Sequence, residues 1–337
     1  MAKQKRILIV RPDRIGDVVL STPFPREIKK TFPDCYVAVL LRKYTQDIYL
    51  NNPNVDKIIL MDDEDSHDSF YKKVREIKDC KFTHSLMLLP TERLNYMLFF
   101  AGIPYRVGVG HKLYQFLTFT RYVDRKKYNP LRHEADYCMD LARKIGVQSE
   151  SLATEIFLTE EEKQKVVQRR IELLQSKKFL IGIHSTSGNS SPNWQPEEYC
   201  NLILKLKDRQ DVSIVVTDNN VPEELVGLEN VSYPNIGKSL RESFINFAAL
   251  DLLISASTGP MHIAATLKVK TLSMFCPLTA CSPKLWGPLG NESKIVLPEE
   301  SYCSTVCPGD PKKCTFTGEG GIDSDLVLNE VKKFLNF

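Results

Sequence analysis

The sequence predicts an α/β protein of two domains, each built on a doubly wound parallel sheet. Three observations support this prediction. The chain of 337 residues is longer than one hydrophobic core usually organises. Short apolar runs alternate with amphipathic stretches, which is the rhythm of strand–helix–strand units in a parallel sheet. The same pattern starts again after a charged stretch near the middle of the chain.

Apolar runs in the first half have the length of buried strands. They are residues 7–10, 37–41, 57–61 and 85–89. After the first run, Leu20, Phe24 and Ile28 are spaced four apart, so a helix there would have one apolar face. Pro23 and Pro25 fit that helix only in or near its first turn.

Residues 159–178 are polar and charge-dense, and we expect them to form a solvated helix between the two halves. The domains are therefore predicted as residues 1–165 and 166–337. Strands of the second half are expected at residues 179–184, 213–217, 252–255 and 271–275, and helices at residues 240–250 and 262–267.

Composition excludes several classes of protein. Lys and Arg number 45 against 42 Asp and Glu, and this near balance gives no support to a nucleic-acid binder. The apolar run at residues 7–10 is interrupted by Arg11, Pro12 and Asp13, so it is too short for a signal peptide. No stretch reaches the roughly 18 apolar residues that a membrane helix needs. We therefore expect a cytoplasmic protein, with at most peripheral contact with the inner face of the cytoplasmic membrane.

The cysteines and an acidic run could suggest metal sites. Five of the nine cysteines come late in the chain: Cys276, Cys281, Cys303, Cys307 and Cys314. No histidine follows His262, so the usual zinc set is incomplete, and reduced thiols are the expected state. The acidic run at residues 62–65 reads as a solvated turn. No metal site is predicted.

Ligands of open α/β sheets bind at the carboxyl ends of strands, and unusual residues follow the first predicted strand. Gly16 allows close approach of the backbone, and Asp17 falls at the start of the next helix. The helix dipole favours a carboxylate there, although position alone favours simple helix capping by Asp17. The segment lacks G-x-G-x-x-G, so no nicotinamide dinucleotide fingerprint is present.

Two further junctions lie in the second half. Residues 184–197 combine small hydroxyl side chains with Gly188, and such a loop can donate hydrogen bonds to phosphate oxygens or simply be a surface loop rich in turn residues. In residues 254–265 a buried strand ends, Gly259 turns the chain and Pro260 opens a helix. Free N–H groups at that helix start make an anion site, while tight packing alone would also explain its small residues.

Taken together, these segments resemble glycosyltransferase family 9, the ADP-heptose:lipopolysaccharide heptosyltransferases. The matching segments, in chain order, are Ile15-Gly-Asp-Val-Val-Leu-Ser-Thr-Pro23, Asn193-Trp-x-Pro-Glu197, Gly237-Lys-Ser-Leu240, Ser257-Thr-Gly-Pro-Met-His-Ile-Ala-Ala265, Phe275-Cys-Pro277 and Ser282-Pro-x-x-Trp-Gly-Pro288. Each segment is weakly specific, but their order and spacing across nearly the whole chain make the set specific.

The resemblance implies a GT-B fold, with two Rossmann-like domains facing across a cleft. It implies that the N-terminal domain binds the acceptor and the C-terminal domain binds ADP-heptose, with inverting transfer that needs neither metal nor cofactor. Asp17 matches the general base of the family, and the turn Thr258, Gly259 and Pro260 matches the one that holds the diphosphate. The other donor-site residues that the resemblance implies are Thr186, Ser187, Glu223, Lys238, Ser257 and His262.

The expected acceptor is a lipid-linked oligosaccharide of the lipopolysaccharide inner core, which carries anionic groups. Basic residues of the N-terminal domain are therefore candidate contacts, although each could equally be a solvated surface charge. The candidates are Arg14, Arg42, Arg93, Arg106 and Lys112. The resemblance also favours a monomer.

The sequence departs from the family pattern at two places. The family commonly has a lysine that reaches the diphosphate where this chain has Pro192, and it usually has aspartate where this chain has Ser257. These departures keep two alternatives open. One is a transferase of the same fold that uses a different nucleotide sugar in surface-polysaccharide assembly, and the other is a nucleotide-sugar-binding homologue without activity.

Overall fold

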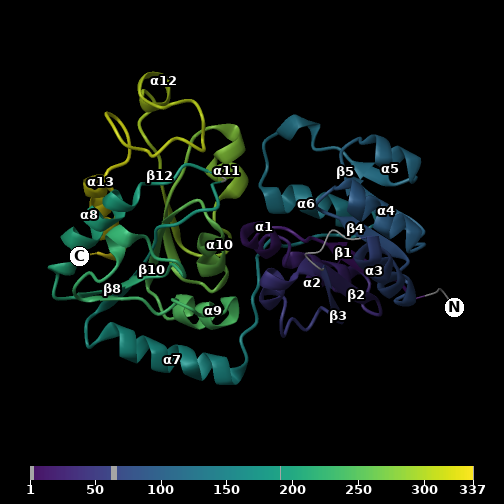
Figure 1. The fold of residues 1–337 in the computed structure, drawn as a ribbon, viewed down its shortest axis with the longest axis horizontal. Coiled ribbons are helices and arrows are strands. Elements are labelled where there is room, and N and C mark those ends of the chain that lie inside the picture. The colour runs from purple at the N-terminus through teal and green to yellow at the C-terminus, as the bar shows by residue number, and fades with distance from the viewer. Residues whose placement is uncertain (1–3, 62–66, 190, 337) are drawn as a thin grey trace. The chain divides into compact units, whose positions relative to one another are not determined.

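The structure is a computed structural model that describes residues 4–61, 67–189 and 191–336, so the acidic run at 62–65 lies outside the described residues. The chain divides into two compact units, Met1–Phe157 and Leu158–Phe337. Each unit is a parallel sheet covered by helices (Figure 1). Among the helices that the structure describes, none combines the length and the apolar character that a membrane span requires.

Within the described part of the first unit, six parallel strands form a sheet in the order β3-β2-β1-β4-β5-β6. Their bounds are β1 Arg6–Val10, β2 Tyr36–Arg42, β3 Lys57–Met61, β4 His84–Met87, β5 Tyr105–Val109 and β6 Arg121–Val123. The chain moves from β1 to β2 and β3 on one side, then returns to β4 on the other side of β1. The order of the strands therefore reverses between β1 and β4, which is where doubly wound sheets bind ligands.

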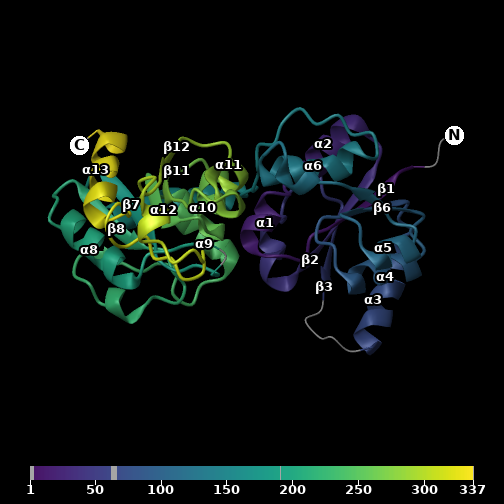
Figure 2. The ribbon, with the colours of Figure 1, turned by 90° about the horizontal axis from the view of Figure 1, so that it is seen from above.

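Helices cover both faces of this sheet. Their bounds are α1 Ile15–Val19, α2 Pro23–Thr31, α3 His67–Asp79, α4 Glu92–Phe100, α5 Leu113–Leu117 and α6 Glu134–Arg143, with short 3₁₀ turns at Lys43–Ile48 and Lys126–Tyr128. Figure 2 shows α2 and α6 on one side of the sheet and α3, α4 and α5 on the other. The predicted apolar face is confirmed, because Leu20, Phe24 and Ile28 are all buried. The helix itself is broken, since Leu20 lies between α1 and α2, and Pro23 is the first residue of α2.

The described residues of the second unit form another parallel sheet of six strands, in the order β12-β11-β10-β7-β8-β9. The strands are β7 Phe179–His184, β8 Val212–Val216, β9 Val231–Ser232, β10 Leu252–Ala256, β11 Lys270–Met274 and β12 Ser293–Val296. The strand order reverses between β7 and β10. The doubly wound α/β architecture predicted from the sequence is thus confirmed for each unit.

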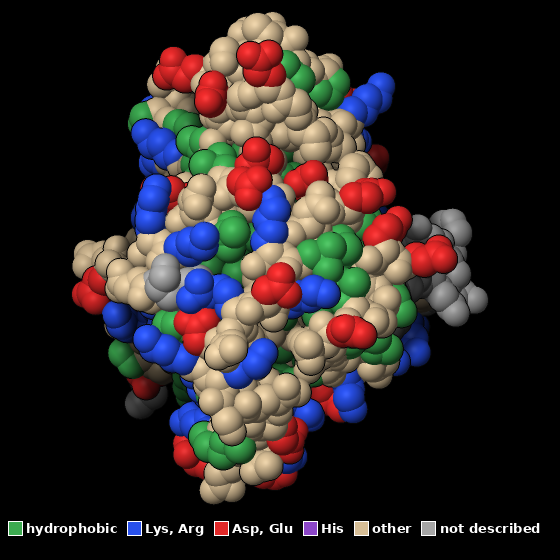
Figure 3. Space-filling model, turned by 90° about the vertical axis from the view of Figure 1, so that its left-hand side faces the viewer, with side chains coloured by type: hydrophobic (Ala, Val, Ile, Leu, Met, Phe, Trp, Pro, Cys, Tyr) green, Lys and Arg blue, Asp and Glu red, His purple; other side chains and the backbone are tan. Residues whose placement is uncertain are grey.

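The helices of the second unit are α7 Glu160–Leu174, α8 Pro196–Lys207, α9 Leu240–Ala248, α10 Gly259–Thr266, α11 Pro283–Trp286, α12 Tyr302–Thr305 and α13 Ser324–Leu335, with 3₁₀ turns at Glu223–Leu225 and Thr279–Cys281. The division between the units falls before α7. That helix starts with a capping box of Thr159 and Glu162, and Arg241 of α9 pairs with the same glutamate at 2.5 Å. On the face shown in Figure 3, basic and acidic side chains are interspersed, so no basic patch for nucleic acid is visible there.

Candidate functional site

Asp17 lies in α1, the short helix after β1, next to the point where the strand order of the first unit reverses. Arg14 is the N-cap of α1 and Asp17 is the third residue of that helix, so Asp17 does not occupy the capping position. Its Oδ1 instead accepts a hydrogen bond from Arg11 Nη2 at 2.5 Å. The side chain stays 22% exposed and can therefore be reached from solvent.

The surroundings of Asp17 set its protonation. Burial, the largest effect, and the neighbouring carboxylates of Asp13 and Glu134 raise the pKa of Asp17 to about 6, although Arg11 and Arg14 act in the opposite direction. A carboxylate with this pKa is largely ionised at neutral pH, yet it is a stronger base than an ordinary aspartate. This is the combination that a general base requires.

Arg11 is held in place by groups on two further segments. Its side chain is 4% exposed, and Nη1 donates to the carbonyl oxygen of Leu88, just beyond β4, at 3.2 Å. Glu134, the first residue of α6, lies 3.9 Å from Arg11 and accepts hydrogen bonds from both terminal nitrogens of Arg125, at 2.7 and 2.9 Å. Sequence reasoning assigned no role to these residues. Arg11 directly follows the first predicted strand, but no motif marks Glu134, which is more than a hundred residues away in the chain.

Three of the expected acceptor contacts are exposed at the carboxyl ends of strands in the first unit. Arg14 precedes α1, Arg42 is the last residue of β2, and Lys112 precedes α5 after the end of β5. Parallel strands end at the same edge of a sheet, so these cations lie along the edge that carries Asp17. Their positions fit a contact with an anionic acceptor.

The other two arginines are placed differently. Arg106 is 7% exposed near the start of β5, donates to the carbonyl oxygens of Ile103 and Thr118, and lies over the ring of Phe99. Its guanidinium thus serves the packing of the unit, contrary to the role expected from the sequence. The guanidinium of Arg93 lies 5.3 Å from the ring centre of Phe70, so it is directed toward α3.

The turn expected to hold the diphosphate follows β10 in the second unit. Thr258 is the N-cap of α10, and Gly259 and Pro260 are the first two residues of the helix. Thr258 is 8% exposed, and its buried hydroxyl has no hydrogen-bond partner among the described residues. An unsatisfied buried hydroxyl is costly, and the first N–H groups of a helix lack partners within the helix. Both features suit an anionic ligand at this turn.

The loop after β7 is organised by a carboxylate that sequence reasoning missed. Asp218 is fully buried just beyond β8 and accepts hydrogen bonds from the backbone N–H and hydroxyl of both Ser185 and Thr186, at 2.6–2.9 Å. The donors of Thr186, expected to face a phosphate, are therefore engaged within the protein. The hydroxyl of Ser187 accepts from the N–H of Asn189 at 3.3 Å. The serine and threonine residues suggested a phosphate loop, but nothing in the sequence indicated that Asp218 accepts their hydrogen bonds.

The Asn-Trp motif anchors the same loop. Trp194 is 2% exposed and donates to the carbonyl oxygen of Ile322 at 2.7 Å, and Asn193 donates to the carbonyl oxygen of Ser185 at 2.7 Å. Ser191 donates to the carbonyl oxygen of Ser257 at 2.8 Å, which ties the loop to the turn before α10. The two segments that the sequence indicated in the second half therefore lie together, at the ends of the adjacent strands β7 and β10.

Two buried histidines belong to these segments. His184 ends β7 and contacts the hydroxyl of Thr217 at 3.1 Å, and burial lowers the pKa of its imidazole, so the ring is neutral at pH 7. His262 is 5% exposed in the first half of α10, which keeps this expected donor-site residue close to the Thr258 turn. Pro192 is buried in the loop that the family usually supplies with a lysine.

Lys238 and Glu223 are two further donor-site residues that the resemblance implies. The carbonyl oxygen of Lys238 accepts from the side chain of Asn219, so its main chain lies near the end of β8. Its ammonium group pairs with Glu242 at 3.2 Å. Glu223 is exposed on a 3₁₀ turn.

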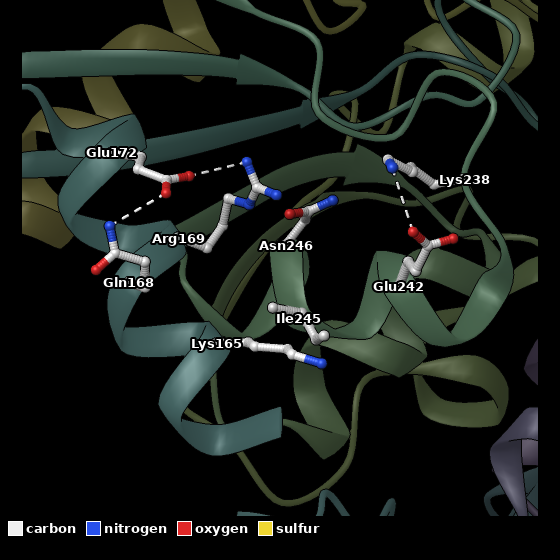
Figure 4. A pocket seen from close by; sticks show the side chains of 8 residues that line it. All are labelled: Lys165, Gln168, Arg169, Glu172, Lys238, Glu242, Ile245 and Asn246. Carbon is white, nitrogen blue, oxygen red and sulfur yellow. Dashed lines mark hydrogen bonds and ion pairs between the residues drawn. The ribbon is translucent and has the colours of Figure 1, made fainter. Parts of the chain in front are cut away.

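Figure 4 shows the groove that Lys238 lines, which has a volume of about 390 Å³. The other lining residues are Lys165, Gln168, Arg169 and Glu172 of α7 and Glu242, Ile245 and Asn246 of α9. Ion pairs within the groove join Arg169 to Glu172 and Lys238 to Glu242. Two of the cations that line the groove are thus each paired with a carboxylate inside it.

All nine cysteines are free thiols. Among the residues that the structure describes, no group of three or more His, Cys, Asp or Glu side chains is arranged to hold a metal ion. Cys281 and Cys314 are buried in the core of the second unit, and Cys303 and Cys307 pack against that core.

Comparison with known proteins matches these features to one family. The profile of Glycosyltransferase family 9 (heptosyltransferase) covers residues 71–313. A candidate glycosyltransferase of Haemophilus influenzae is 26% identical over 98% of this chain and 97% of its own, and lipopolysaccharide heptosyltransferase 2 of Escherichia coli is 21% identical over 98% of both chains.

Solved structures show the same fold. A family 9 glycosyltransferase of Veillonella parvula superposes with a TM-score of 0.81 at 23% identity, covering 98% of this chain and 97% of its own. The ADP-heptose lipopolysaccharide heptosyltransferase II of E. coli gives a TM-score of 0.76 at 20% identity, covering 98% of both chains. The resemblance seen in the sequence and the expected GT-B fold class are thereby confirmed. With its matching profile, its paired α/β units and its ordered motifs, the chain belongs to glycosyltransferase family 9 and is a glycosyltransferase of the heptosyltransferase family.

Proposed function

We propose that this enzyme transfers a heptose from ADP-heptose to a lipid-linked acceptor of the lipopolysaccharide inner core, with inversion and without a metal ion. The observation that carries the proposal is Asp17, a reachable carboxylate at the carboxyl edge of the first sheet with a pKa of about 6. A general base for an acceptor hydroxyl needs this basicity and this position.

In the proposed reaction, Asp17 removes the proton of the acceptor hydroxyl while the hydroxyl oxygen forms a bond to the anomeric carbon. The bond from that carbon to the diphosphate oxygen breaks at the same time, and ADP leaves with the electron pair. Attack from the face opposite the diphosphate inverts the anomeric configuration. The hydroxyl of Thr258 and the N–H groups at the start of α10 stabilise the charge of the departing diphosphate.

The proposed partners follow from the same sites. The exposed cations Arg14, Arg42 and Lys112 contact anionic groups of the acceptor, and the turn at Thr258 to Pro260 contacts the donor. Relatives named as lipopolysaccharide heptosyltransferases support this choice of donor and acceptor. We further propose a cytoplasmic monomer that works at the inner face of the cytoplasmic membrane, where a lipid-linked acceptor is available.

The test combines donor binding with product analysis. In EDTA, ADP-heptose should raise the melting temperature of the protein, by an amount set by its concentration relative to Kd. Mass spectrometry with a deacylated inner-core acceptor should show one added heptose. Asp17→Asn should lower the rate of transfer about 10²–10⁴-fold while ADP-heptose still stabilises the variant. A variant that transfers at the normal rate would rule out Asp17 as the base.

A second candidate is transfer of a different sugar in surface-polysaccharide assembly. Pro192 and Ser257 favour it, because the family commonly has a lysine and an aspartate there. The same stabilisation assay should therefore include UDP- and GDP-sugars. Stabilisation by one of these, without a response to any ADP-sugar, would select the second candidate. Stabilisation without transfer to any acceptor would instead indicate a binding protein.

A further inference from the structure

Helix α5 and the turn after it expose a set of large apolar side chains, which we call the apolar ridge. Its members and their exposed fractions are Leu113 74%, Phe116 79%, Leu117 53% and Phe119 80%. Single exposed apolar residues are common, but a contiguous group within seven residues marks an interaction site. Figure 2 shows α5 beside α4 on one face of the first unit.

The polar side chains of the same segment are buried. Gln115 and Thr118 are 2% and 1% exposed, and Thr120 is 7% exposed. Asn95 of α4, itself buried, donates to the hydroxyl of Thr118 at 2.5 Å and accepts from the hydroxyl of Thr120 at 2.9 Å. Gln115 donates to the carbonyl oxygen of Val109 at 3.2 Å. The segment is thus reversed relative to an ordinary surface helix, because a hydrogen-bonded polar network holds the apolar ridge outward.

The backbone conformation of Phe119 is a second, independent observation about the apolar ridge. Its φ is +53°, in the left-handed region that bulky residues rarely adopt. Glycine or asparagine would suit this backbone better, and a ring that is 80% exposed gains little from packing. Neither the local backbone nor the core of the unit explains a phenylalanine at this position.

Basic residues flank the apolar ridge. Lys112 precedes it, and Arg121, Lys126 and Lys127 follow it, all with exposed side chains. Residues 111–128 contain five Lys and Arg residues and a single acid, Asp124, whose carboxylate lies 3.8 Å from His111. Apolar and aromatic side chains bordered by cations complement the surface of an anionic bilayer. Two copies of the same surface would bring like charges together, which disfavours self-association.

We propose that the apolar ridge inserts into the surface of a bilayer containing anionic phospholipid and holds the first unit there. The reason for such docking rests on the proposed function, since a lipid-linked acceptor is presented at a membrane. The fold places the apolar ridge near the sheet edge at which the acceptor is proposed to bind. Helix α5 leaves the carboxyl end of β5, two strands from β1, so its origin lies about 10 Å along the sheet edge from the end of β1. Lys112, a proposed acceptor contact, directly precedes Leu113.

The first experiment measures binding of the full chain to sedimented vesicles of phosphatidylcholine, with and without phosphatidylglycerol. The wild type should bind the anionic vesicles. The double variant Phe116→Ser with Phe119→Asn, which we call the ridge variant, should weaken that binding at least about tenfold. Val167→Ser with Ile171→Ser on α7 is the matched control, because these side chains are 61% and 64% exposed. The control should bind like the wild type. Both double variants should melt within a few degrees of it, since the replaced side chains are exposed.

Three outcomes would overturn the proposal. The wild type could fail to bind anionic vesicles, or the ridge variant could bind them as well as the wild type does. Light scattering during size exclusion could instead show a wild-type dimer that the ridge variant abolishes, which would assign the surface to self-association.

A second readout separates this proposal from the proposed function. With a water-soluble deacylated acceptor, the ridge variant should transfer sugar at the wild-type rate, whereas with acceptor in vesicles its rate should fall at least about tenfold. If the wild type transferred no heptose to either acceptor but still bound vesicles through the ridge, the proposed function would fail and the docking surface would stand. If the wild type and the ridge variant transferred heptose to the vesicle-borne acceptor at equal rates, the docking surface would fail and the proposed function would stand.

Discussion

Arg11 Nη2 donates a hydrogen bond of 2.5 Å to Asp17 Oδ1, and only 4% of the arginine side chain is exposed. Two effects on the pKa of Asp17 oppose each other in this pair, because burial favours the protonated carboxyl group and the guanidinium cation favours the carboxylate. Burial is the larger effect, so the pKa of Asp17 is raised to about 6 even though the guanidinium opposes the change. The arginine thus keeps a partly buried base ionised at neutral pH, and this balance can be tested.

The first prediction concerns the pH dependence of the reaction. Only the ionised form of Asp17 accepts a proton, so kcat/KM should rise with pH and level off above an apparent pKa near 6. The measurement is the rate of transfer to a water-soluble acceptor at low acceptor concentration between pH 5 and pH 8. A rate that does not change between pH 5 and pH 7 would contradict the assignment of Asp17 as the base.

The second prediction concerns Arg11. Replacing it with glutamine removes the opposite charge, so the acid limb of the rate profile should move to higher pH by about one unit or more. Arg11→Lys keeps a charge and should shift the limb less. Arg14→Gln is the control, because Arg14 is exposed and has the smaller effect on the pKa of Asp17. Circular dichroism must show that the variants are folded, and a shift as large in Arg14→Gln would exclude a specific role for Arg11.

The third prediction links the same pKa to stability. The folded protein holds the Asp17 proton more tightly than the unfolded chain, because the pKa is raised from its ordinary value to about 6. Relative to Asp17→Asn, the free energy of unfolding of the wild type should therefore fall by about 2 kcal/mol as pH rises from 4 to 7, and stay constant above that range. Urea denaturation of both proteins at pH 4 and pH 7 measures the difference. A wild type that gains stability relative to Asp17→Asn over this interval would show that the pKa is lowered instead.

The sequence was most informative where strands are buried on both faces. The expected strand at 179–184 matches β7 residue for residue, since continuous apolar runs mark such strands well. The expected strand at 57–61 also matches β3, although β3 lies at an edge of its sheet and is only partly buried. Strand β5 was missed because its run contains Arg106 and Gly108. Strand β9 has only two residues at an edge of its sheet, so no pattern could develop.

In the candidate site, too, some residues could be predicted from local sequence patterns and others could not. Asp17 and Thr258 lie at strand–helix junctions, which the alternation of the chain reveals. Asp218 and Glu134 act through contacts with distant segments, and pairing between such segments leaves no local signature. The role predicted for Arg106 was wrong for a related reason. A basic residue near a loop resembles a surface charge until the carbonyl oxygens to which it donates are known.

The fourth prediction concerns the unpaired hydroxyl of Thr258. Thr258→Val keeps the shape of the side chain and removes a buried polar atom without a partner among the described residues, so stability should stay equal or increase. If the hydroxyl binds the diphosphate, the Kd for ADP should rise about tenfold. Thr266→Val on the same helix is the control, because that hydroxyl donates to the carbonyl oxygen of His262 at 2.8 Å. An unchanged Kd for Thr258→Val, measured by calorimetry, would remove the residue from the donor site.

The last prediction concerns Asp218, which accepts four hydrogen bonds from Ser185 and Thr186. In Asp218→Asn one carboxylate oxygen becomes an NH₂ group that faces donors, so the free energy of unfolding should fall by about 2–4 kcal/mol. The loop that these residues begin is tied through Ser191 to Ser257, so its loosening should also weaken donor binding. Asp208→Asn, at an exposed helix end, should change neither quantity. Calorimetry well below the melting temperature separates the two effects. A destabilised variant with an unchanged Kd for ADP would show that Asp218 supports the fold without positioning the donor, because the turn at Thr258 would then keep its shape independently of the loop.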